Sequence, residues 1–358
     1  MISTWQSTSP RGATPLLPAS GRVLITGASG FIGGHLARRL ELQGREIAGL
    51  VRPKSSTARL ESPQMQLRRG DVTDIDSLRA AVADVDVVYH LAGVVKAVHY
   101  ADYARVNEQG VANLLKVCAE RTTPPTVVLV SSMAAAGPAV GELPKLETEP
   151  AAPVSRYGRS KRAGEVVAEQ YADRVPITIV RPPIVFGEYD DACLNLFRPI
   201  RRFGIHLVPG FRTRRVSLIH ADDLAAMLLL AADRGQRLAP LGTTRDPSQG
   251  YYFAADSEMP SVGEMGRIIG EACGCRMVWV VPAPEAVAWC IGASNELVSR
   301  LRNTPSIVNL DKIREATAGS WICSVERARQ ELGFQVQHSL RERFRQTAEF
   351  YLNAGWMR

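Results

Sequence analysis

From Arg22 onward, short runs rich in Val and Ile alternate with longer segments whose apolar residues recur at helical spacing. Strand character is strongest in RVLIT (22–26), EIAGLV (46–51), MQLRR (65–69), VDVVYH (85–90), TVVLVSS (126–132) and ITIVR (177–181). The helical pattern is found between them, in GGHLARRLELQG, DIDSLRAAVAD, EQGVANLLKVCAE and RSKRAGEVVAEQYA. This order predicts right-handed βαβ units. The expected fold is therefore α/β, with a doubly wound parallel sheet covered by helices on both faces.

Beyond Val185 the alternation loosens into loops rich in Arg, Pro and Gly. One strand-like piece, GYYFAA (250–255), and helical stretches such as SLRERFRQTAEFYLNAG follow. We expect a smaller C-terminal lobe for the substrate beside the core. The expected division is a loose tail at 1–20, a core at 21–185 to which 215–255 returns, and a lobe at 186–214 and 256–358.

The composition is that of an ordinary soluble globular protein, with 46% hydrophobic and 22% charged residues in a chain of 358. The tail lacks the apolar run of a signal peptide. The six cysteines lack metal-type spacing, so we expect reduced thiols, a cytoplasmic location and no metal site.

The sequence TGASGFIGGHLARRL places Gly27, Gly30 and Gly33 between the first strand and the first helix. The first glycine permits a tight turn, the second lets the backbone approach a pyrophosphate, and the third lets the helix pack on the strand. The helix N-terminus then offers free N–H groups to the anion. A dinucleotide site of the Rossmann type is predicted here, formed by Gly27, Ser29, Gly30, Phe31, Ile32 and Gly33.

The end of the second strand indicates which cofactor is bound. A carboxylate there bonds a ribose 2′-hydroxyl, whereas a cation accommodates a 2′-phosphate. The chain has Val51 at the acidic position, followed by Arg52 and Lys54. This favours NADP(H) without excluding NAD(H), unless Arg52 is simply an exposed loop residue. Asp71 and Val72, after the third strand, are candidates to touch the adenine, although Asp71 could instead cap the following turn.

The stretch SRYGRSKRAGE puts Tyr157 and Lys161 four positions apart. On a helix these residues lie on one face. They could be a structural pair that arose by chance, or a phenol and an ammonium held together for proton transfer. The spacing alone leaves both interpretations open.

Several motifs occur together in a specific order: TGASGFIG, GDVTD, YHLAG (89–93), RVNEQGVANLL (105–115), VSSMAAAG (130–137), YGRSK (157–161), RPPIVFG (181–187) and HADDLAAMLL (220–229). In this respect the chain resembles the extended short-chain dehydrogenase/reductases. That superfamily includes NAD(P)-dependent epimerases, dehydratases and 3β-hydroxysteroid-type dehydrogenases. The resemblance covers roughly residues 21 to 350. It implies a Rossmann-type core, a substrate lobe and, often, a homodimer.

The resemblance assigns catalytic roles to Ser132, Tyr157 and Lys161. Alcohol–ketone interconversion needs a proton acceptor or donor at the substrate oxygen while a hydride passes to or from the nicotinamide. A neighbouring ammonium and the positive nicotinamide ring are expected to favour the phenolate of Tyr157, and Ser132 to orient the substrate oxygen. The implied cofactor contacts also include Leu91, Ala92, Gly93, Tyr157, Lys161 and Pro182.

Three further polar residues have structural alternatives. Asn107 could support the site through a water or backbone bond, or simply cap a helix. Asp223 is expected as a helix N-cap or first-turn acid. His220 is expected to be structural or at the edge of the pocket.

Departures from the sugar-nucleotide enzymes favour another branch. Ile184 stands where epimerases usually carry Asn, and Val216 and Ser217 stand where they carry an Arg-Asp pair. Met133 and Ala134 follow Ser132 where dehydratases place acids. The chain thus resembles the reductase and 3β-hydroxysteroid-dehydrogenase-like branch. Candidate substrate-pocket residues are Lys96, Met133, Ala134 and Ile184.

The leading hypothesis is an NAD(P)-dependent oxidoreductase acting on a secondary alcohol or ketone of a bulky apolar, sterol-like or other hydrophobic, small molecule. One alternative is a sugar or nucleotide-sugar epimerase that uses the same residues without net redox change. Another is a dinucleotide-sensing or RNA-associated protein, although no specific nucleic-acid module is visible.

Two segments keep several interpretations open. The apolar stretch MVWVVPAPEAVAWCIGA (277–293) is broken by Pro282, Pro284 and Glu285, which argues against a transmembrane helix. It could line a pocket, touch a membrane surface peripherally, or pack within the lobe. A second segment is rich in arginine and could be a solvated face or an anion-binding surface. Its members are Arg198, Arg201, Arg202, Arg212, Arg214 and Arg215.

Overall fold

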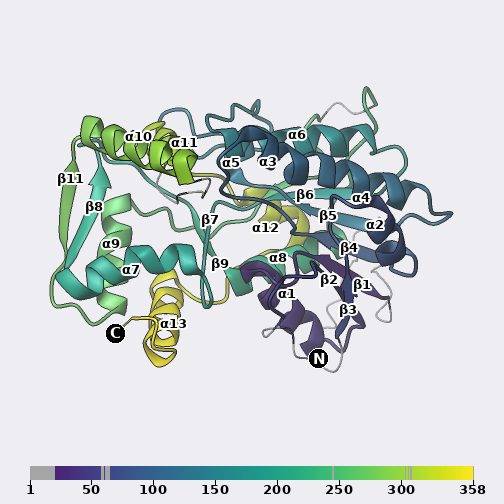
Figure 1. Cartoon of the computed structure of the whole chain (residues 1–358), viewed down its shortest axis with the longest axis horizontal. Helices are drawn as coiled ribbons and strands as arrows, with labels where there is room; N and C mark the ends of the chain where they lie inside the picture. The colour runs from purple at the N-terminus through teal and green to yellow at the C-terminus, as the bar shows by residue number, and fades with distance from the viewer. Residues whose placement is uncertain are drawn as a thin grey trace, which may run out of the picture.

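Seven parallel strands form the central sheet of the computed structural model, which describes residues 21–57, 60, 65–243, 246–302, 304, 306 and 309–357 (Figure 1). Their order across the sheet is β10-β6-β5-β4-β1-β2-β3. The strands are β1 (Val23–Thr26), β2 (Ile47–Val51), β3 (Met65–Arg69), β4 (Val87–His90), β5 (Thr126–Val130), β6 (Ile177–Arg181) and β10 (Tyr251–Phe253). The six strands expected from the N-terminal half are confirmed, and the expected tail at 1–20 lies outside the described residues.

Helices cover both faces of this sheet, because nearly every residue of the inner strands is apolar and buried. One face packs on α1 and α8, and the other packs on α2, α4 and α6. The helices of this region are α1 (Phe31–Leu42), α2 (Ile75–Val82), α3 (Tyr100–Asn107), α4 (Gln109–Ala119), α5 (Met133–Ala136), α6 (Arg156–Gln170), α8 (Ala221–Arg234) and α12 (Glu326–Leu332). The doubly wound Rossmann-type fold is therefore confirmed.

The late segment GYYFAA adds the seventh strand, β10, which pairs in parallel with β6. A separate two-stranded pair forms from β7 (Ile184–Phe186) and β9 (Leu218–His220). The strand β9 leads directly into α8, which packs on the sheet. Parts of the chain after residue 215 thus lie against the core.

The remaining elements form a lobe beside the sheet (Figure 1). They are α7 (Asp191–Phe203), β8 (Ile205–Pro209), α9 (Val262–Ala272), β11 (Trp279–Ala283), α10 (Glu285–Arg302), α11 (Leu310–Thr317) and α13 (Leu340–Asn353). Buried residues of α7, α9 and α13 share one apolar cluster, which includes Phe197, Ile269 and Phe344. Of the helices in the described part of the chain, none has the length and apolar character required to cross a bilayer.

The order of the strands reverses between β1 and β4, which lie side by side. In open parallel sheets, ligands bind beyond the carboxyl ends of the strands at such a switch point. The glycine turn follows β1, and the YHLAG segment follows β4. The topology therefore brings these two predicted cofactor segments together.

Candidate active site

The glycine turn is shaped for close approach of another group to its backbone. Gly27 has φ +74°, and a Cβ added there would lie 2.8 Å from the amide nitrogen of Ala92. A Cβ added to Gly33 would lie 2.8 Å from the Cα of Ala28. Gly30 is the N-cap of α1 and makes no side-chain cap, so the first N–H groups of the helix face the turn. This arrangement fits a pyrophosphate at the helix N-terminus.

The two cations predicted to read the ribose, Arg52 and Lys54, are exposed just after β2. Asp71 accepts hydrogen bonds from the backbone N–H and the hydroxyl of Thr73, at 2.9 and 2.8 Å. Burial acts to raise the pKa of Asp71, but the Thr73 bonds and the charges of Arg52 and Arg105 hold it below its ordinary value. Asp71 therefore caps its turn, and its contact with adenine stays a prediction.

Replacing Arg52 by Asp should weaken NADPH binding far more than NADH binding. An aspartate repels a 2′-phosphate but can accept a hydrogen bond from a 2′-hydroxyl. Dissociation constants for both cofactors, measured by fluorescence titration of the native chain and the variant, check this. Equal losses for the two cofactors would remove the basis for an NADP(H) preference.

Tyr157 and Ser132 come from two helix starts that pack together. Ser132 is the N-cap of α5 and accepts a hydrogen bond from the backbone N–H of Ala134 at 3.1 Å. Tyr157 is in the first turn of α6. Gly158 lets α6 approach the carbonyl of Ala134 so closely that no Cβ would fit between them. Both Tyr157 and Ser132 are partly exposed, and the Ser132 hydroxyl acts to lower the pKa of Tyr157.

The electrostatics of the Tyr157–Lys161 pair differ from the expected pattern. Burial raises the pKa of Tyr157 to about 12, opposed by its hydrogen bond with Ser132. Burial likewise lowers the pKa of Lys161 to about 8. The Lys161 Nζ donates to the carbonyl of Val130 at 2.8 Å, and it is 3.7 Å from where a Cβ on Gly93 would lie. Within the protein alone, desolvation therefore raises the pKa of Tyr157, whereas the ammonium of Lys161 was expected to lower it.

Asn107 joins the helix of Tyr157 to the segment after β4. Its side-chain oxygen accepts from the N–H of Val94 at 2.8 Å, while its amide nitrogen donates to the carbonyl of Val94 and the hydroxyl of Ser160, both at 2.9 Å. The backbone bond expected of Asn107 is confirmed, and Asn107 is the last residue of α3 rather than a helix cap.

The lobe helix α11 holds the start of α6, which sequence reasoning missed. The Asp311 carboxylate accepts from the backbone N–H groups of Arg156 and Tyr157 at 2.8 and 3.1 Å. Glu315 accepts from the Ser155 hydroxyl at 2.6 Å. These acids neutralise free donors at the positive end of α6. About 150 residues separate the partners, so no local sequence pattern could have indicated the contact.

The predicted pocket residues divide into two groups. Lys96 and Ile184 are exposed, with Ile184 directly after Pro183. Met133 is 2% exposed and packs in a cluster with Phe253, so it offers almost no surface to a substrate. Ala134 is also buried.

The remaining predicted cofactor residues lie around the turn and the ends of the neighbouring strands. Ser29, Phe31, Ile32, Leu91 and Ala92 are partly exposed, Gly93 is exposed, and Val72 and Pro182 are buried. The Pro182 carbonyl accepts from the backbone N–H of Met133 at 2.8 Å, which joins the ends of β5 and β6.

At the two positions where the epimerases usually carry an Arg-Asp pair, this chain has buried side chains. Val216 is 5% exposed, and Ser217, fully buried, accepts a hydrogen bond from the N–H of Cys323 at 3.1 Å. Arg215 is one step out of register and donates to the carbonyl of Met259 at 2.8 Å. Neither of these two positions therefore carries a cation that could bind a diphosphate.

A polar network lies where α1 meets the lobe. His35 Nδ1 is 2.6 Å from Asp222, and its Nε2 is 3.0 Å from the carbonyl of Glu188. Ligand atoms of His35, Glu188 and Asp222 all lie within 4.8 Å of one another, although no metal grouping is visible in the sequence. His220 is the N-cap of α8, and Asp223, in its first turn, pairs with Arg343. Since both nitrogens of His35 already have partners, we interpret the network as structural.

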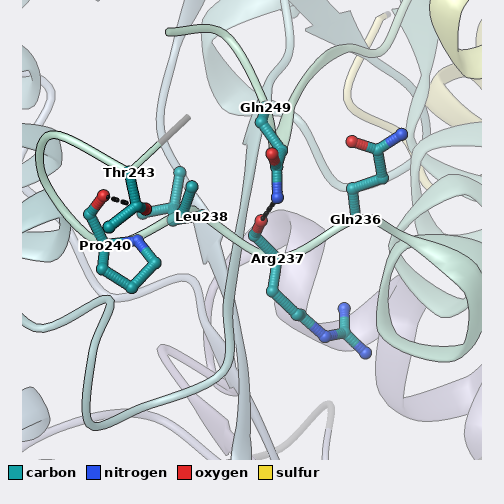
Figure 2. A pocket seen from close by; sticks show the side chains of 7 residues that line it. Gln236, Arg237, Leu238, Pro240, Thr243 and Gln249 are labelled. Atoms are coloured by element: carbon teal, nitrogen blue, oxygen red, sulfur yellow. Dashed lines mark hydrogen bonds between the residues drawn. The ribbon is translucent and has the colours of Figure 1, made fainter. Parts of the chain in front are cut away.

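A hollow is lined by the segment that connects α8 to β10 (Figure 2). Its lining residues precede β10 and so lie at the amino end of that strand; they are Gln236, Arg237, Leu238, Ala239, Pro240, Thr243 and Gln249. Arg237 there donates to the carbonyl of Ala231 at 2.9 Å, and its own carbonyl accepts from Gln249 at 3.0 Å. This hollow is remote from the glycine turn, which follows the carboxyl end of β1.

The arginine-rich segment is not one cationic stripe. Arg214 is buried and pairs with Glu285 at 2.5 Å, and Arg201 donates to the carbonyl of Cys273 at 3.0 Å. Arg198 bonds the carbonyl of Trp356, while Arg202 lies over the ring of Phe203. Its arginines thus have separate roles.

A Rossmann core, a glycine cradle at the switch point and a Ser–Tyr–Lys group beside it define a dinucleotide-dependent enzyme of the extended short-chain dehydrogenase/reductase type. The comparison with protein families agrees: residues 23–241 match the NAD dependent epimerase/dehydratase family, and the chain belongs to it.

Relatives and solved structures are similar to this chain over most of its length. The ceramide reductase of Caulobacter vibrioides is 31% identical over 95% of this chain and 97% of its own. A 3 beta-hydroxysteroid dehydrogenase/Delta 5-->4-isomerase of Mycobacterium tuberculosis is 25% identical over 96% and 93%. The structure of DesIV, a dTDP-glucose 4,6-dehydratase of Streptomyces venezuelae, aligns with a TM-score of 0.75 and 20% identity over 94% of this chain and 98% of that one. This last likeness supports the fold alone.

Proposed function

We propose that this chain is an oxidoreductase that interconverts a secondary alcohol and a ketone on a bulky apolar substrate, with a preference for NADP(H). The observation that carries the proposal is the close packing of the starts of α5 and α6, which leaves the side chains of Ser132 and Tyr157 both partly exposed, with Lys161 one turn further along α6. The homodimer that the resemblance implies stays a prediction.

In the proposed reaction, Tyr157 donates a proton to the substrate oxygen during reduction and accepts one during oxidation. A bound nicotinamide would supply or accept the hydride. Ser132 donates a hydrogen bond to the same oxygen and so fixes the carbonyl in place. A high pKa of Tyr157 keeps its proton in place until charge develops on the substrate oxygen. Lys161 is the candidate donor to the ribose.

The proposal of an apolar substrate rests on the absence of a charged anchor at two positions and on the names of two relatives. Val216 and Ser217 are buried where epimerases place a charged anchor, and losing such a charge-assisted bond would weaken diphosphate binding. The names of the two curated relatives refer to a ceramide and to steroids, which are apolar molecules. These points favour an apolar substrate over a nucleotide sugar.

A cofactor-oxidation assay tests the proposal. The chain is mixed with NADPH and, separately, a 3-ketosteroid, a keto-sphingoid lipid and a UDP-hexose, and absorbance of the reduced ring is followed. Net oxidation with an apolar ketone and none with the sugar nucleotide supports the proposal. Interconversion of the sugar epimers without net oxidation would favour the epimerase alternative instead.

A further inference from the structure

The lobe carries an apolar sheet face that nothing in the described chain covers. Strands β8 and β11 pair in parallel at the margin of the molecule (Figure 1). Ile205 is the register partner of Trp279, and Leu207 that of Val281. All four side chains are exposed, Leu207 at 66% and Trp279 at 63%. We call these four residues the ribbon face.

The opposite face of the ribbon is the buried one. His206 is 4% exposed and bonds the carbonyl of Val262 at 3.0 Å, where α9 begins. A Cβ on Gly263 would touch Val280 at 3.2 Å. A two-stranded ribbon with one face on the core normally shows polar side chains on the other. Here the exposed face is apolar instead, and contiguous exposed apolar surface of this kind marks an interaction site.

The apolar surface extends at both ends of the ribbon and continues along the chain. Phe203 and Met277, two positions before the paired residues, are 64% and 61% exposed, and Phe211, after the ribbon, is 77% exposed. Helix α10 follows β11 immediately, and an exposed stripe at helical spacing runs along it. This stripe consists of Val287, Ile291, Val298 and Leu301.

Three arginines border the ribbon face. Arg202 precedes Phe203, Arg276 precedes Met277 and Arg212 follows Phe211, and all three are exposed. Among the residues that the structure describes, no acid forms an ion pair with any of them, and Arg202 lies 5.4 Å from the ring centroid of Phe203. The border is thus cationic. Two copies joined through this face about a twofold axis would bring arginines of like charge together without acids between them.

We propose that the ribbon face with its arginines docks on an anionic membrane surface. The apolar side chains, Trp279 among them, would enter the boundary between headgroups and acyl chains, where tryptophan is enriched. The arginines would contact anionic headgroups. This inference does not depend on the proposed redox activity.

Membrane docking would also bear on the active site. Gly292 of α10 packs on Ile313 of α11, and α11 holds the backbone of Tyr157 through Asp311. Glu296 of α10 lies 3.5 Å from Arg156. The exposed helix α10 and the helix of Tyr157 therefore share the neighbour α11.

Vesicle flotation with the full chain tests the proposal. The chain is mixed with vesicles of phosphatidylcholine alone, or of phosphatidylcholine with phosphatidylglycerol, and the bound fraction is measured at low and high salt. We expect binding to the anionic vesicles, weaker binding to the neutral ones, and a decline as salt rises. Absence of binding to either kind of vesicle would overturn the proposal.

Two sets of variants localise the contact. Leu207→Glu with Trp279→Glu should abolish binding, and Arg202→Gln with Arg276→Gln should lower the partition coefficient about 25-fold, since each arginine near an anionic surface contributes about a fivefold gain. Leu42→Glu, at an 82% exposed position on α1, is the matched control and should bind like the native chain. Cofactor binding by each variant checks its folding.

Native-like binding by both sets of variants would contradict the assignment. Analytical ultracentrifugation adds a second readout. A self-associated chain that Leu207→Glu dissociates, and that does not bind vesicles, would show that a second copy covers the face instead.

Discussion

Replacing Tyr157 by Phe is expected to lower turnover by about 10²–10⁴-fold, the usual contribution of a positioned acid or base. The phenyl ring keeps the shape of the side chain and loses only the hydroxyl. The glycine turn is unaffected, so NADPH should bind with an affinity close to that of the native chain. Steady-state kinetics and fluorescence titration of NADPH check the two statements separately.

Tyr103→Phe is the matched control for this experiment. Its ring lies 6.3 Å from that of Tyr157, and its side chain is buried, yet it has no assigned part in proton transfer. We expect the control to keep most of the turnover. Persistent activity in Tyr157→Phe, or an equal loss in both variants, would contradict the role given to Tyr157.

Replacing Arg343 by Met is expected to reduce the free energy of unfolding by about 3–5 kcal/mol. Arg343 of α13 donates two hydrogen bonds to Asp223 of α8, at 2.8 and 2.7 Å, and both residues are buried. Removing the guanidinium leaves a carboxylate with no matched charge between lobe and core. Urea unfolding followed by circular dichroism measures the change.

Two controls separate the buried pair from general effects on α13. Arg345→Met removes an exposed arginine whose partner Glu349 is 4.0 Å away, and should change stability by less than about 1 kcal/mol. The double variant Asp223→Leu with Arg343→Met removes both charges and should recover much of the loss. If Arg343→Met alone is as stable as the native chain, the buried pair does not stabilise the contact between the lobe and the core.

The central sheet could be predicted from the sequence because most of its strands are short apolar runs and helices of clear period occur between them. Even the late strand at Tyr251–Phe253 was visible as a β-rich run. Its pairing with β6 was not, because register depends on distant parts of the chain. The glycine turn was predictable because it is local: strand, three glycines and helix lie within a dozen residues.

The features that were not predicted all depend on contacts between distant segments. Asp311 and Glu315 occur in an unremarkable helical stretch, and only the fold brings them to the start of α6. The apolar segment 277–293 fitted a pocket, a membrane surface or lobe packing equally well. Its composition could not indicate that Trp279 is exposed. Apolar residues occupy both faces of β11, so the sequence does not distinguish the exposed face from the buried one.

The most direct test of the proposed chemistry is to follow the hydride itself. The chain is supplied with NADPH deuterated at its transferable position and with the apolar ketone that gives the fastest cofactor oxidation, and the alcohol product is analysed by mass spectrometry. We expect one deuterium on the carbinol carbon of each product molecule, and almost no labelled product from Tyr157→Phe. Alcohol formed without deuterium, or labelled alcohol formed equally well by the variant, would contradict hydride transfer assisted by Tyr157.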